Sequence, residues 1–226
     1  MTRNLRLDLH VHSRHSPDSR LSVAAIVERL PYAGLGGFAL TDHNSTAGHS
    51  ELRALAREHP EYLFVPGVEV STAEGHLLLY GVEEAPPVRR PLAEIVDWAR
   101  ARAAVAVLAH PFRRSHGVGA RVASIAPVDG VEIVNGHSTV VANARAQLVA
   151  SRRSLATTGG SDAHHDRDLG RAVTEFPDGV ETADDAVAAL ARRTVRAEGH
   201  SMTVWGQLRW SVRTGLLRAS RGFRPI

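Results

Sequence analysis

Short apolar runs alternate with helix-like stretches along this chain, and this alternation limits the possible folds more than any other feature. Between most of the apolar runs lie Ala-, Glu- and Arg-rich segments with helical spacing, at 22–30, 46–58, 91–104 and 139–151. Strands that alternate with helices usually pair in parallel, so the sequence predicts an α/β fold. The runs rich in Val, Leu and Ile are typical of strands and cover 5–11, 37–40, 63–70, 77–80, 105–109, 131–134 and 155–158.

Periodicity alone leaves two architectures open, a TIM-like barrel and an open doubly wound sheet. In both, functional residues gather at the carboxyl ends of the strands. A chain of 226 residues with 43% hydrophobic content suits one substantial core. We therefore expect one catalytic domain over 1–200 and a basic amphipathic tail over 201–226. The only linker-like segment within the domain is 83–90.

The composition excludes several kinds of function. No Cys is present, which rules out disulfides, thiolate zinc sites and cysteine nucleophiles, so any metal must be held by nitrogen and oxygen. No run of about 18 apolar residues occurs and the N-terminus lacks a signal-like segment, which predicts a cytoplasmic protein. With 27 basic and 24 acidic residues, the net charge of +3 is too small to indicate nucleic-acid binding by itself.

The end of the first predicted strand carries the first candidate ligands. Alternation along a strand is expected to put Asp8, His10 and His12 on one face, opposite the apolar residues between them. Two imidazoles two residues apart can share one metal ion. Taken alone, the same pattern also fits a solvated polar face with two incidental histidines.

The same arrangement recurs at other predicted strand ends, which favours a metal site over coincidence. Asp42 and His43 close the second strand, His110 closes the fifth, and the segment 160–164 closes the last with another Asp and His. An α/β fold brings these ends together at its active site. Imidazole and carboxylate ligands without thiolate suit Zn²⁺, Mn²⁺ or Fe²⁺ better than Mg²⁺ or Ca²⁺.

Glu69 adds a carboxylate inside an apolar run, where an unpaired charge would be costly. A buried salt bridge would satisfy it, but a position between two metal ions explains it better. Asp8 and Asp42 are candidates to orient metal-bound imidazoles through hydrogen bonds. Among the other histidines, His49, His59 and His200 are expected at the surface, while His116, His137 and His165 lie close in sequence to the proposed site.

The ordered motifs DLHVHS, TDHN, GVE, HLLLYG, AHP and GGSDAH, within about 5–165, resemble the PHP (polymerase and histidinol phosphatase) family. The resemblance implies a distorted seven-stranded (β/α)7 TIM-like barrel and up to three metal ions. It places His10, His12, Glu69 and Asp162 on the first ion, Glu69, His76 and His110 on the second, and Asp18, His43 and His164 on the third.

Two of these ligands rest on the resemblance more than on the strand pattern. His76 begins its apolar run and does not end it, so the strand-end argument does not cover it. Asp18 falls in the SRHSPDS loop, where His15 is an alternative ligand.

The resemblance also predicts the activity, a metal-dependent hydrolase of phosphoesters, either phosphatase or phosphodiesterase. A hydroxide bridging two or three divalent ions (Mn, Zn or Fe) would attack a small phosphorylated substrate, with Glu69, Asp162 and His164 at the reacting centre. Arg113 or Arg114 could clamp the phosphate by bidentate hydrogen bonds, with Arg167 as a weaker candidate.

Other functions stay open at this level. One is a 3′-5′ exonuclease or repair enzyme, another an amidohydrolase-like activity, and a third a non-catalytic scaffold docked through the tail. The tail contains five arginines and no acidic residue after His200, with an apolar stripe of helical spacing within 203–220. It fits a terminal helix packed on the barrel, or an element that contacts an anionic membrane, a nucleic acid or a partner protein.

Overall fold

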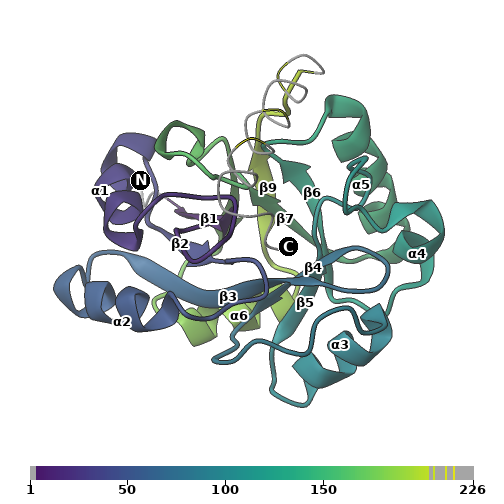
Figure 1. Ribbon diagram of the computed structural model, residues 1–226, viewed down its shortest axis with the longest axis horizontal. Coiled ribbons are helices and arrows are strands. Elements are labelled where there is room, and N and C mark those ends of the chain that lie inside the picture. The colour runs from purple at the N-terminus through teal and green to yellow at the C-terminus, as the bar shows by residue number, and fades with distance from the viewer. Residues whose placement is uncertain (1–3, 204–205, 207–211, 213–215, 217–226) are drawn as a thin grey trace.

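The computed structural model describes residues 4–203 together with 206, 212 and 216. Its strands curl around a common centre and most helices lie outside them (Figure 1). One sheet contains all the described strands, in the order β7-β6-β5-β4-β3-β2-β1-β8-β9. The strands are β1 (Leu5–Val11), β2 (Gly37–Leu40), β3 (Leu63–Ser71), β4 (His76–Tyr80), β5 (Val105–Leu108), β6 (Gly130–Asn135), β7 (Ala156–Gly160), β8 (Ala172–Phe176) and β9 (Arg196–Gly199).

Three of the helices begin at capping side chains. Ser22 accepts a hydrogen bond from the third residue after it, and Thr139 does the same at its helix. Thr182 forms a capping box with Asp185. The helices are α1 (Val23–Ala33), α2 (His49–Glu58), α3 (Leu92–Arg100), α4 (Gly119–Ile125), α5 (Val140–Arg153) and α6 (Ala183–Ala191), with a 3-10 turn η1 (Asp166–Asp168).

The sheet closes almost completely into a barrel because the segment after β7 returns to β1. Val11 and Ala163 form a parallel bridge, and the His12 amide donates to the Ala163 carbonyl over 3.0 Å. Gly160 permits this approach, since a Cβ at that position would lie 2.3 Å from the Cβ of His10. The ends of β1 and β7, with their polar residues, therefore lie side by side.

The predicted seven-stranded parallel barrel is correct only in part. β1, β2, β3, β5, β6 and β7 run in one direction, but β4 is antiparallel to both of its neighbours. Only 72–75 join β3 to β4, too few residues for the crossover that a parallel pair needs. β8 and β9 add two further antiparallel strands beyond β1, giving nine among the described residues.

The apolar core of the barrel divides into three clusters of buried side chains. Apolar side chains of β1, β3, β4 and β5 pack with α6 in one cluster, while α1, α3 and other outer helices pack on the sheet in two more. Leu7 and Leu9 share the cluster with α6, but Val11 packs with α1. The pairing of β1 with β2 shifts register between Asp8 and Val11, so simple alternation along β1 is broken there.

Candidate metal centre

The predicted ligands converge at one end of the barrel, where the parallel strands terminate. Each of them is buried, and none exposes more than 6% of its surface. Within the described part of the chain they form several groups of three whose donor atoms all lie within 4.8 Å of one another. The residues gathered there are His10, His12, Asp18, His43, Glu69, His76, His110, Asp162 and His164.

The antiparallel direction of β4 explains the position of His76. His76 pairs with Ser71, so the start of β4 lies beside the end of β3. Its Nδ1 lies 2.9 Å from Oε1 of Glu69. The resemblance therefore selected a residue that a rule based on parallel strand ends could not reach.

Glu69 occupies the middle of the centre. Its Oε1 lies 2.9 Å from His110 Nε2 as well as from His76 Nδ1. The same carboxylate thus faces histidines on both sides, as a bridging ligand must. Its Oε2 lies 3.3 Å from His10 Nε2, 3.4 Å from His12 Nε2 and 2.9 Å from His43 Nδ1.

Two aspartates complete the arrangement at its edges. Asp162 Oδ1 lies 3.3 Å from His12 Nε2 and 3.6 Å from His10 Nε2. Asp18 Oδ2 lies 3.3 Å from Nε2 of both His43 and His164. Asp18 therefore faces two imidazoles, and Asp162 faces three, because its Oδ1 also lies 3.6 Å from Nδ1 of His164.

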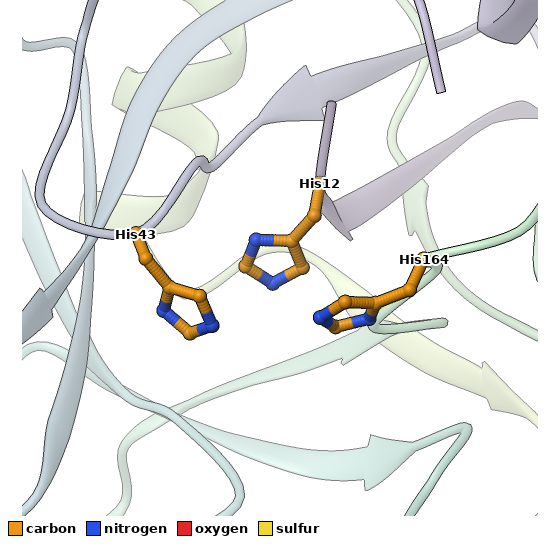
Figure 2. Close-up of side chains that lie close together, drawn as sticks. All are labelled: His12, His43 and His164. Carbon is orange, nitrogen blue, oxygen red and sulfur yellow. The ribbon is translucent and has the colours of Figure 1, made fainter. Parts of the chain in front are cut away.

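Three imidazoles from separate segments turn toward one another in Figure 2, those of His12, His43 and His164. The centre of the His12 ring lies 4.5 Å from that of His43 and 4.4 Å from that of His164. His15, the alternative to Asp18, instead has its Nε2 3.6 Å from the Glu51 carboxylate, outside this group.

The donor atoms fit divalent cations. Nε2 of His10, Nε2 of His12 and Oε2 of Glu69 are buried and form no hydrogen bond. Buried polar atoms without partners are costly, and these point at one another, so a cation among them would satisfy all three. Imidazole and carboxylate donors without thiolate suit Zn²⁺, Mn²⁺ or Fe²⁺.

The electrostatics of the centre differ between its side chains. Burial alone would lower the pKa of His43 and of His10, but the carboxylates that face them outweigh it and raise the pKa of His43 to about 10 and that of His10 well above its usual value, so a cation would displace a proton there. Burial lowers the pKa of His12 to about 3 and that of His110 to about 3, which leaves both imidazoles neutral near pH 7. Burial alone would raise the pKa of Glu69, but His76, His43 and His10 outweigh it and hold that pKa well below its usual value. Neutral imidazole and ionised carboxylate are the metal-binding states of these side chains.

Glu132, on β6, also reaches the centre although the sequence analysis did not select it. Its Oε1 lies 2.9 Å from Nδ1 of His10, and its Oε2 accepts a hydrogen bond from the His110 amide over 2.8 Å. Asn135 donates to the same Oε2 over 3.1 Å. The available signal was a carboxylate inside an apolar run, the same one that identified Glu69.

The predicted roles of Asp42 and Asp8 need correction. Asp42 contacts no imidazole directly; Ser16 donates to its Oδ1 over 3.0 Å, and the same hydroxyl lies 3.0 Å from Nδ1 of His12. Asp42 therefore orients His12 only through Ser16. Asp8 accepts from the amides of Ser161 and Gly170 over 2.8 and 2.9 Å, so it fixes backbone segments and not a ring.

The predicted phosphate-binding arginines fall in different environments. Arg113 is buried, and its Nη1 pairs with Oδ2 of Asp162. Arg114 and Arg167 are exposed. Only Arg113 among these arginines contacts the candidate ligands directly.

His49 is buried, although it was expected at the surface. It begins α2, is only 2% exposed, and its Nε2 lies 2.9 Å from the carbonyl oxygen of Gly67. The start of α2 packs tightly on the sheet, because a Cβ on Gly48 would lie 2.7 Å from Leu40. His200 is exposed, as predicted, and His59 is half-buried.

A nearly closed α/β barrel that collects histidines and carboxylates at one end defines a metal-binding barrel protein. The PHP-associated family model matches residues 141–195. A two-domain protein from Bacteroides vulgatus, containing a predicted PHP-like metal-dependent phosphoesterase, superposes with a TM-score of 0.71 at 20% identity, over 88% of this chain and 65% of that one. The matched model, over residues 141–195, and this superposition, in the fold, agree with the resemblance that the motifs carry.

Two relatives of known activity are similar over part of the chain. The 5′-3′ exoribonuclease Rnm of Salmonella typhimurium is 29% identical over 58% of this chain and 45% of its own length. The 3′,5′-nucleoside bisphosphate phosphatase of Chromobacterium violaceum is 36% identical over 36% of this chain and 29% of its own length. The chain thus spans less than half of each. In the described part of the chain, no helix combines the length and apolarity needed to cross a membrane.

Proposed function

We propose that this protein hydrolyses a phosphoester bond of a small phosphorylated substrate, using two or three divalent cations, Mn, Zn or Fe. The observation that carries the proposal is the position of Glu69, whose two carboxylate oxygens face histidines on opposite sides. A carboxylate so placed can join two cations in one centre. Similarity to proteins described as PHP-like metal-dependent phosphoesterases supports the same reaction.

The proposed ligand sets follow the contacts around Glu69. His10, His12 and Asp162 would hold the first cation together with one oxygen of Glu69, since each of the two carboxylates lies within 3.6 Å of Nε2 of both imidazoles. The other oxygen would serve a second cation with His76 and His110. Asp18, His43 and His164 would hold a third.

The reaction draws on both the cations and the chain. Clustered divalent cations supply Lewis acidity, which lowers the pKa of water and neutralises phosphoryl oxygens. Arg113 adds a guanidinium beside Asp162, close enough to the centre to bind a phosphoryl oxygen of the substrate. Glu132 and Ser16 accept hydrogen bonds from the Nδ1–H groups of His10 and His12. Each Nε2 is then free to bind a cation.

Nucleotide phosphoesters are the first substrates to examine. Both relatives of known activity are named for reactions at phosphates of nucleotides or RNA. The segment between β5 and β6 holds only α4 and short loops, so no large cap encloses the centre on that side. We therefore expect a small nucleotide monoester or diester to reach the cations.

Exonuclease activity is the second candidate, because the similarity to the exoribonuclease covers 58% of this chain. End-labelled RNA and DNA oligonucleotides would show it directly. Turnover of oligonucleotides above that of mononucleotides, with binding that weakens steeply as salt rises, would favour this candidate.

The first experiment measures metal content and phosphoesterase activity of protein purified without chelators. Wild type, Glu69→Gln and His10→Ala are compared on p-nitrophenyl phosphate and bis-p-nitrophenyl phosphate, with Glu61→Gln, an exposed glutamate, as the control. We expect two or three transition-metal ions in wild type and the control, and loss of turnover in both centre variants. Wild type that takes up no Mn²⁺, Zn²⁺ or Fe²⁺ and stays inactive on both esters would overturn the proposal and favour a scaffold.

A further inference from the structure

Helix α5 presents an apolar stripe to solvent, in addition to the face that packs on the barrel. Val140 and Val141 are 67% and 69% exposed, and Leu148 is 54% exposed. Together with Ala144 they lie on one side of the helix, because residues three and four apart share a face. Ala142, Ala146 and Ala150 occupy the buried side. Contiguous exposed apolar surface of this kind usually marks a contact with something else.

The segment of chain that carries this stripe is positively charged. Residues 112–155 are all described and contain four exposed arginines, Arg114, Arg121, Arg145 and Arg152, but no exposed acidic side chain. Of the acidic groups there, Glu132 is buried in the centre and Asp129 accepts a hydrogen bond from a backbone amide. Ile125, at the end of neighbouring α4, adds a further aliphatic side chain that is 72% exposed.

The continuously described part of the chain ends beside the start of this helix. Met202 forms a parallel bridge with Thr139, and its amide donates to the Ser138 carbonyl over 2.8 Å. Val212 and Leu216, further along the chain, are 57% and 68% exposed. The sequence after His200 contains five arginines and no acidic residue. A basic sequence therefore follows directly after the point where the chain contacts the start of α5.

We propose that the α4–α5 face binds the surface of an anionic lipid bilayer. The positive charge of this face disfavours its pairing with a second copy, because like charges would meet. The aliphatic stripe favours lipid over nucleic acid, since Val, Leu and Ile neither stack on bases nor hydrogen-bond to them. Arginines beside aliphatic side chains suit a bilayer of anionic headgroups.

Co-sedimentation of the full chain with vesicles tests this proposal. The vesicles are phosphatidylcholine alone or phosphatidylcholine mixed with phosphatidylglycerol. We expect binding only to the anionic mixture, reversed by salt. Val141→Ser combined with Leu148→Ser should weaken it about tenfold or more, and Arg145→Gln or Arg152→Gln about fivefold each. Val88→Ser and Arg57→Gln, exposed residues elsewhere, are the matched controls and should bind as wild type does.

Several outcomes would overturn the proposal. These are an absence of binding to anionic vesicles, equal binding to both vesicle types, or stripe variants that bind as the controls do. Tight salt-dependent binding of RNA or DNA without vesicle binding would identify a nucleic-acid surface. A dimer detected by light scattering in wild type but not in the stripe variants would identify a self-association face. The phosphoesterase assay is independent of all these outcomes, because no residue of the stripe belongs to the centre.

Discussion

The metal centre and the α5 face depart from the usual distribution of side chains in opposite ways. At the centre, histidines and carboxylates that normally lie at the surface are almost fully buried, while α5 exposes valines and a leucine. The buried ligands contact one another, and Glu132, Ser16 and Asp42 support them through hydrogen bonds. The exposed stripe has no such partner among the described residues. The first arrangement therefore calls for cations, and the second for an external surface.

The largest expected effect comes from removing one charge at the middle of the centre. Glu69→Gln keeps the shape of the side chain but removes the anion that faces five histidines. Phosphoesterase turnover should fall on the order of a thousandfold, equivalent to several kcal/mol. Metal content measured alongside should drop by at least one ion per chain. Full turnover with full metal content would remove Glu69 from the centre.

Removing the cations from wild type should have the next largest effect. Without cations the buried carboxylates and the imidazoles that face them lose their shared partner, so chelator-treated protein should unfold at a lower temperature. Cations bound at about 100 times their dissociation constant contribute roughly 2.7 kcal/mol, a shift of about 5–10 °C for a chain of this size. Differential scanning calorimetry with and without chelator measures the shift, and adding Mn²⁺ or Zn²⁺ should restore it.

A variant of Glu132 tests the residues that support the ligands, separately from the ligands themselves. Glu132→Gln would leave the proposed ligands in place but would remove the carboxylate beside His10 Nδ1 and the His110 amide. Cation affinity should weaken about 10–100-fold, as for other partners of metal-bound histidine. Titration with Co²⁺, followed by visible absorption, reports this change without relying on turnover.

A matched variant and a contrary result complete that test. Glu181→Gln changes an exposed glutamate just before α6 and should titrate as wild type does. If Glu132→Gln bound Co²⁺ as tightly as wild type, with an unchanged spectrum, the hydrogen bonds to His10 and His110 would be structural only.

These residues show which parts of the fold and centre the sequence could predict. The ends of β1, β2, β5 and β7 could be identified because parallel strands place their last residues at one edge. The reversed direction of β4 could not, since apolar runs carry no sign of strand direction. His76 was therefore reached only through the resemblance.

Side chains that act on other side chains were harder to predict than the ligands. Glu132 shares its signal with Glu69 but lies outside the ordered motifs that carried the family resemblance. Asp8 was assigned to the face of His10 because strict alternation was assumed, and the register shift in β1 breaks that alternation. The burial of His49 depends on how closely α2 packs on the sheet at Gly48, a tertiary contact that its helical spacing does not reveal.

The smallest expected effect concerns the α5 stripe and sharpens the contrast with a buried side chain of the same type. Leu148→Ser changes a leucine that is 54% exposed, so the free energy of unfolding should change by no more than about 0.5 kcal/mol. Leu78→Ala, at a fully buried position on β4, should lower it by roughly 2–5 kcal/mol. Denaturant unfolding of both variants measures the difference. A cost for Leu148→Ser close to that of Leu78→Ala would mean that the stripe is already covered in solution, by the tail or by another copy, and a bilayer would then have no apolar face on α5 to bind.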